Sequence, residues 1–149
     1  MLEKRNTILV IVIMIAAVFF VSWYISIRIY SLHGNKIETV TIGNSKFYAE
    51  VVSSDVKMQK GLGGRSGLCD SCAMLFKFSQ AEMHSFWMKD MRFPLDIIWI
   101  KNGEVVHVEK NVLENFSGIL SPQVDADSVL EINAGNVDKL DIKIGDRSR

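Results

Sequence analysis

The sequence predicts a single, mainly β domain at the α+β margin, either a sandwich or a partly closed barrel with two short helices, preceded by one transmembrane helix. Three observations support this prediction. Short runs rich in β-branched and aromatic residues alternate with turn residues, Asn102-Gly103 is a tight hairpin signal, and the N-terminal segment is long and uncharged. The chain has 149 residues, which suits one domain besides the anchor.

The N-terminal segment is predicted to be a membrane anchor. Ile8 to Ile27 contains no charged residue, and as a helix it would be about 30 Å long, which matches the hydrocarbon core of a bilayer. A cleaved signal peptide is the rival interpretation, but its apolar region is usually only about 7–15 residues long. The chain therefore divides into a tail (1–7), an anchor (8–30), a linker (31–36) and a β domain (37–149).

Orientation is predicted from the flanks of this segment. Lys4 and Arg5 precede it and Arg28 follows it, so the positive-inside rule is nearly balanced. A short tail followed by a folded domain favours a single-pass protein of the cytoplasmic membrane, with its N-terminus inside and its domain outside.

The charge of the domain argues against nucleic acid as a partner. Without Lys4, Arg5 and Arg28 the chain has 14 Lys and Arg, and without Glu3 it has 16 Asp and Glu, a formal charge of −2. No basic face is evident in the sequence. The predicted partners are the membrane, through residues 8–30, and a small polar ligand.

The predicted elements follow from hydrophobic runs and the residues that interrupt them. Asp55 is expected to cap the first helix and Gly61 to end it. A long loop spans Leu113 to Ala126, and residues 142–146 are expected to turn back and close the sheet. The elements are, in order, strands at 37–42 and 47–52, a helix at 56–60, strands at 73–78, 86–88, 97–100, 105–109 and 128–132, and a helix within 134–140.

The chain resembles the domain of unknown function 192 family (UPF0127) over roughly residues 47–146. The segments that carry the resemblance are GL-x-x-R at 61–65, MLF at 74–76, FWMK at 86–89, PLDII at 94–98, VLE at 129–131 and GD at 145–146. The resemblance implies a compact, mainly β domain of jelly-roll-like or barrel character, in proteins that are often exported or anchored to a membrane. It implies no established activity. Gly63 departs from the family pattern, which has a large side chain there, and Cys69 and Cys72 lie outside it.

The two cysteines, in the pattern Cys69-x-x-Cys72, leave three interpretations open. They are a structural disulfide, part of a metal site, or a redox dithiol. Outside the cytoplasm we expect the structural disulfide.

Charged residues among large apolar ones form the predicted ligand site. Lys89 and Asp96 each lie one step from residues expected in the core, so their charges must be paired or face a pocket. In the structural interpretation an Arg–Asp or Lys–Asp pair fixes the strands. In the functional one Arg65 and Lys89 bind anionic or hydroxyl groups, Trp87 provides a stacking face, and Asp96 belongs to the same pocket.

The sequence thus predicts a small-ligand-binding or accessory module rather than an enzyme, and no cofactor is expected. One alternative is an envelope hydrolase in which Asp96 acts with His84, because acid–base catalysis needs a second group of different pKa, such as His84 or Glu131. The other is a metal-handling protein that uses Cys69, Cys72 and His84.

Overall fold

A computed structural model describes residues 11–20 and 33–149. Residues 11–20 are helical, and the rest of the predicted anchor lies outside the described residues. Within the described part of the chain, no helix is both long enough and apolar enough to cross a bilayer.

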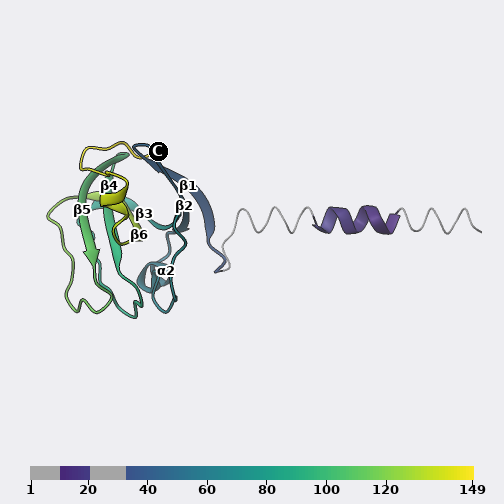
Figure 1. The fold of residues 1–149 in the computed structure, drawn as a ribbon, viewed down its shortest axis with the longest axis horizontal. Helices are drawn as coiled ribbons and strands as arrows, with labels where there is room; N and C mark the ends of the chain where they lie inside the picture. Colours follow the sequence, from purple (N-terminus) through teal and green to yellow (C-terminus); the bar gives the residue numbers. More distant parts are fainter. Residues whose placement is uncertain (1–10, 21–32) are drawn as a thin grey trace, which may run out of the picture.

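The domain is built on one six-stranded sheet (Figure 1). The strand order is β1-β2-β3-β6-β4-β5, and all neighbours are antiparallel except the parallel pair β2–β3. The elements are β1 (Lys36–Ile42), β2 (Ser45–Val52), α2 (Asp55–Lys60), β3 (Cys72–Glu82), β4 (Leu95–Lys101), β5 (Glu104–Val112), β6 (Ala126–Asn133) and α3 (Asn136–Lys139).

The mainly β character with two short helices in the domain is confirmed, while the sandwich alternative needs correction. The strands lie in one sheet rather than two, and the sheet is not closed, since β1 and β5 are its edges. The C-terminal residues reach both edges. Ser148 bridges to Ile42 and Arg147 bridges to Glu104, so the end of the chain crosses from the β5 side to the β1 side (Figure 1).

The two hairpins form where the turn residues predict them. Asn102 and Gly103 both have positive φ, 52° and 72°, as a type I′ turn requires between β4 and β5. Gly43 has φ 56° between β1 and β2. Both turns depend on residues for which a left-handed backbone costs little.

Two local predictions were wrong. Residues 86–88 are not a strand, because Phe86 makes only an isolated bridge to Leu120. The N-cap of α2 is Ser54, which makes no side-chain capping bond, and Asp55 is instead the first residue of the helix. A carboxylate in the first turn still complements the helix dipole from there.

The sheet has an apolar core on each face. Along β6, Leu130 and Ile132 point to one core and Val129 to the other, as the period of two in a strand requires. The first core contains α3 and residues of β1 and β5. The second lies beneath α2 and the segment 83–93 and contains Leu62, Phe76 and Trp99, among other residues. We call these the α3 face and the α2 face.

Candidate functional site

A cavity of about 220 Å³ opens on the α2 face. Its walls come from α2 and the turn that follows it, from β3, and from the segment 83–91, with one residue of β6. Its lining mixes aromatic and thioether-bearing side chains with several polar and charged ones. The lining residues are Met58, Gln59, Lys60, Gly61, Leu62, Phe76, Phe78, Met83, His84, Ser85, Phe86, Trp87, Lys89, Met91 and Glu131.

The segment 83–91 is fixed against the sheet by hydrogen bonds and ring contacts. Phe86 exchanges two backbone hydrogen bonds with Leu120, and the indole N–H of Trp99 donates to the carbonyl oxygen of His84 at 2.9 Å. The Phe86 ring packs edge-on against Phe76, with centroids 4.9 Å apart. One wall of the cavity is therefore held by the core, although the segment has no regular secondary structure.

Glu131 lies at the centre of the sheet and is the buried acid of the cavity. It stands in β6 opposite Met74 of β3 and Ile97 of β4, and only 5% of the residue is exposed. Its Oε2 atom is buried and has no hydrogen-bond partner within the described residues. Burial raises the pKa of Glu131 to about 8. The positive charge of Arg65 lowers this pKa, but by less than burial raises it. At neutral pH the group is therefore mostly a neutral carboxylic acid, able to donate a hydrogen bond.

His84 supplies a second polar group of the same cavity. Its ring stacks on Phe78, with centroids 3.4 Å apart and an angle of 11° between the planes. Its Nε2 atom is buried and lacks a hydrogen-bond partner among the described residues. A fixed ring with an unused nitrogen is suited to contact a ligand.

Trp87 and Lys89, two of the four residues predicted to share a ligand site, also line this cavity. Both side chains are exposed, Trp87 by 47%. Phe86, which precedes Trp87, and Met88, which lies between Trp87 and Lys89, point into the core. This alternation places the indole and the ammonium at the solvent side. The structure therefore brings Trp87, Lys89 and His84 together.

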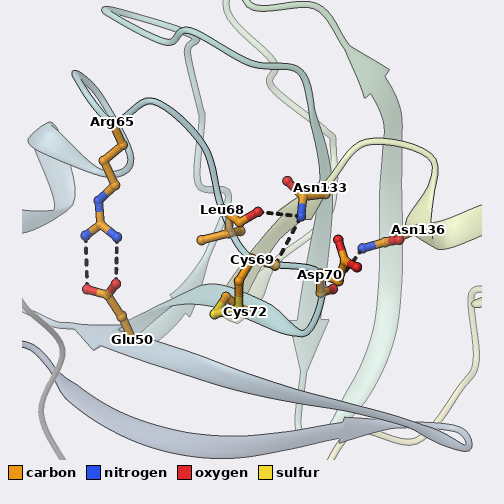
Figure 2. The surroundings of a disulfide bond; sticks show 8 residues. All are labelled: Glu50, Arg65, Leu68, Cys69, Asp70, Cys72, Asn133 and Asn136. Carbon is orange, nitrogen blue, oxygen red and sulfur yellow. Dashed lines mark hydrogen bonds and ion pairs between the residues drawn. A yellow bond between two sulfur atoms is a disulfide. The ribbon is translucent and has the colours of Figure 1, made fainter. Parts of the chain in front are cut away.

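Arg65 does not line this cavity. Its guanidinium pairs with Glu50 through two contacts, 2.6 and 3.0 Å long, and both side chains are only 13% exposed (Figure 2). Asn35 donates to the same carboxylate at 2.9 Å. The Arg–carboxylate pair of the structural interpretation thus exists, with Glu50 rather than Asp96 as the acid. Arg65 influences the cavity through its charge, which acts on Glu131.

Asp96 lies on the other face of the sheet and does not line the cavity. It is fully buried, and each carboxylate oxygen accepts a backbone N–H at 2.8 Å, Oδ1 from Asn111 and Oδ2 from Val137. Asn111 has φ 52°, and Val137 lies in the first turn of α3. Asp96 thus links β4 to an irregular position in β5 and to the start of α3. The structure does not bring Asp96 and His84 into one site.

Cys69 and Cys72 form a disulfide (Figure 2). The loop that carries them is also held by Asn133, whose side-chain amide donates to the carbonyl oxygens of Leu68 and Cys69, each at 3.1 Å. Within residues 11–20 and 33–149, no group of three or more His, Cys, Asp and Glu side chains is arranged to hold a metal ion. The structure therefore does not assemble Cys69, Cys72 and His84 into a metal site.

Comparison with known families identifies the domain. The model of the DUF192 family, described as an uncharacterized ACR, matches residues 38–149. The chain belongs to the DUF192 family. No curated protein matches it.

Two crystal structures share the DUF192 fold of this chain. One is a protein of unknown function from Novosphingobium aromaticivorans, 29% identical, with a TM-score of 0.77 over 81% of this chain and 90% of that one. The other, from Sinorhizobium meliloti and described as a candidate transcription regulator, is 25% identical, with a TM-score of 0.74 over 77% of this chain and 94% of that one.

Glu131 lines the cavity of this DUF192 domain, a position that the sequence alone does not indicate. It appears in the VLE segment of the family pattern and was considered only as a second acid for Asp96. The available signal is local: one carboxylate stands between Leu130 and Ile132 in a strand that is otherwise apolar over 129–132. A strand pattern cannot reveal that α2 and the segment 83–91 build a cavity above that carboxylate.

Proposed function

We propose that the domain is a binding module for a small ligand, which occupies the cavity over Glu131. The observation that carries this proposal is the buried Oε2 atom of Glu131, which has no hydrogen-bond partner within the described residues and belongs to a side chain that lines the cavity. A buried polar atom left unpaired costs about 1–3 kcal/mol of stability. A ligand that hydrogen-bonds this atom would recover that free energy.

The lining favours a flat, largely apolar ligand. Phe76, Phe78 and Trp87 provide ring surfaces, and the thioethers of Met83 and Met91 adapt to irregular shapes. The neutral acid at the base donates to an acceptor on the ligand. The cavity is smaller than the roughly 300–1,000 Å³ typical of pockets for drug-sized ligands, so the part of the ligand inside it is limited to one or two rings.

An acid–base enzyme is the second candidate, with different residues from those first predicted. Glu131, with its raised pKa, and His84, with an unused Nε2 atom, line one cavity, and this pairing favours proton transfer to a bound substrate. Asp96 has no part in it. In this case Glu131→Gln would abolish turnover of a substrate while leaving its binding intact.

The binding proposal is tested with a neutral bicyclic alcohol, 2-naphthol, and the full chain in lipid nanodiscs. Isothermal titration, with empty nanodiscs as the blank, should show saturable binding. Glu131→Gln, which still donates and accepts hydrogen bonds, should retain it. Glu131→Leu should weaken it about tenfold, because one buried hydrogen bond is lost.

Glu114→Leu is the matched control, since Glu114 is exposed on the loop between β5 and β6 and does not line the cavity. It should bind 2-naphthol as the unaltered chain does. The absence of saturable binding to the unaltered chain, or equal affinity of the Glu131→Leu variant, would overturn the proposal.

We also propose that residues 8–30 anchor the protein in the cytoplasmic membrane, with the domain outside. Two observations support this: the uncharged run from Ile8 to Ile27, and the disulfide, because such bonds persist in oxidising compartments. A protease added to spheroplasts should digest the domain while a cytoplasmic marker protein survives. Protection of the domain until the cells are lysed would refute the orientation.

A further inference from the structure

We propose that the ligand is an amphipathic anion, with a flat apolar body in the cavity over Glu131 and an anionic group held at its mouth by Lys60, Lys89 and Arg92. This inference rests on the proposed binding function and names the chemical class of the ligand. It depends on a second depression beside the cavity and on where the charges of the α2 face lie.

The second depression is open, about 760 Å³ in volume, and adjoins the cavity. The two share Gln59, Lys60, Lys89 and Met91, so they lie next to each other on the surface. Its lining contributes three cations, Lys60, Lys89 and Arg92, against one carboxylate, Asp90. We call this region the basic mouth.

Lys60, Lys89 and Arg92 form no ion pair with any other residue in the described ranges. Five other lysines, Lys36, Lys77, Lys101, Lys110 and Lys143, pair with carboxylates, whereas Lys46, Lys57 and Lys139 form no ion pair in the described ranges either. Cations that remain unpaired beside a cavity are available to an anion.

The two ends of the site differ in charge, and this sets the shape of the ligand. Glu131, which is mostly uncharged at neutral pH, lines the cavity, whereas the mouth carries three cations and one carboxylate. Phe76, Phe78 and Phe86 also line the cavity, and a simple inorganic anion would not use these apolar rings.

Three probes separate the parts of this inference: 2-naphthyl phosphate, 2-naphthol and inorganic phosphate, each titrated into the full chain in nanodiscs of neutral lipid. Naphthyl phosphate should bind about tenfold more tightly than naphthol at low salt, and raising the salt to 0.5 M should shrink the difference. Inorganic phosphate at the same concentration should not bind, because it lacks the apolar body.

The matched variants are the double substitution Lys60→Gln with Lys89→Gln and, as a control, Lys46→Gln with Lys139→Gln. Lys46 and Lys139 are exposed and do not line the cavity or its mouth. The first pair should weaken binding of the phosphate ester by more than it weakens binding of naphthol, so that the preference for the ester is lost. The second pair should change neither affinity.

Equal binding of the ester and the alcohol would overturn this inference while leaving the small-ligand proposal intact. Binding of inorganic phosphate as tight as that of the ester would also overturn it, since it would mean a surface anion site without the cavity. Failure of both aromatic probes would overturn the binding function itself, together with this inference.

Discussion

The two faces of the sheet each bury one carboxylate, and they treat it in opposite ways. On the α3 face, Asp96 has both oxygens occupied by backbone N–H groups. On the α2 face, Glu131 has a buried oxygen without a partner in the described residues, beside a cavity. A fully satisfied buried acid supports structure, whereas an unsatisfied one costs stability and indicates function. Equal burial therefore does not imply an equal role.

The largest expected effect comes from paired isosteric substitutions of the two acids. Asp96→Asn should lower the free energy of unfolding by about 4 kcal/mol, because the new amide N–H₂ faces a backbone N–H donor in a dry core. Glu131→Gln should change it by less than about 1 kcal/mol near pH 4.5, where ionisation of the unfolded chain adds little and the neutral acid and the amide are similar. Guanidinium unfolding followed by tryptophan fluorescence measures both. If the two variants lose similar amounts of unfolding free energy, the two buried acids do not differ in their structural role.

The pH dependence of stability sharpens the same comparison. The pKa of Glu131 is raised from 4.5 to about 8, so the folded state holds this proton more tightly than the unfolded state. The contribution to stability is complete below pH 4.5 and is lost as the pH rises through 8, on the order of 3 kcal/mol between pH 5 and 9. Arg65 opposes the shift, and His84, Lys60 and Lys89 line the same cavity.

The Glu131→Gln variant is the control for that pH dependence. Its unfolding free energy should fall less between pH 5 and 9 than that of the unaltered chain, by the amount assigned to Glu131. Parallel pH profiles for the two proteins would mean that Glu131 is ionised in the folded state.

A smaller effect is expected where the turn after α2 meets the segment 83–91 on the α2 face. A Cβ atom added at Gly63 would lie 2.9 Å from the carbonyl oxygen of Lys60 and 3.2 Å from that of Lys89, and both oxygens belong to the backbone. Gly63→Ala should therefore cost about 2 kcal/mol and weaken ligand binding, because both lysines move. Gly67→Ala is the control, since no atom lies within 4 Å of its added Cβ. Equal unfolding temperatures for the two variants would show that the backbone around Gly63 has room for a Cβ atom.

The smallest effect is expected for the disulfide, which supports neither buried acid directly. Cys69→Ser with Cys72→Ser should cost about 1–2 kcal/mol, because the closed loop is very short and Asn133 still holds it. Binding of 2-naphthol should be unchanged. Treating the unaltered chain with a reductant should reproduce the loss, and a fall in ligand affinity in either case would show that the loop belongs to the site.

The strands and hairpins of this fold were predictable because their signals are local. Asn102-Gly103 specifies its turn through backbone conformation alone, and runs such as 97–100 are strongly β-forming in any setting. Residues 86–88 were misassigned as a strand for the converse reason. Their alternation is real, with Phe86 and Met88 buried and Trp87 exposed, but they pack on the sheet instead of pairing within it.

For the site, the sequence determined that Trp87 and Lys89 are candidates and that some charge must lie close to the core. It could not decide which acid serves structure and which lines a cavity. Asp96 and Glu131 both stand in apolar strands, and only the fold places two N–H donors beside one and a cavity beside the other. Local patterns depend on near neighbours in the chain, whereas hydrogen-bond satisfaction depends on residues brought together from β5, α2, α3 and the segment 83–91. The cavity itself is therefore a property of tertiary structure.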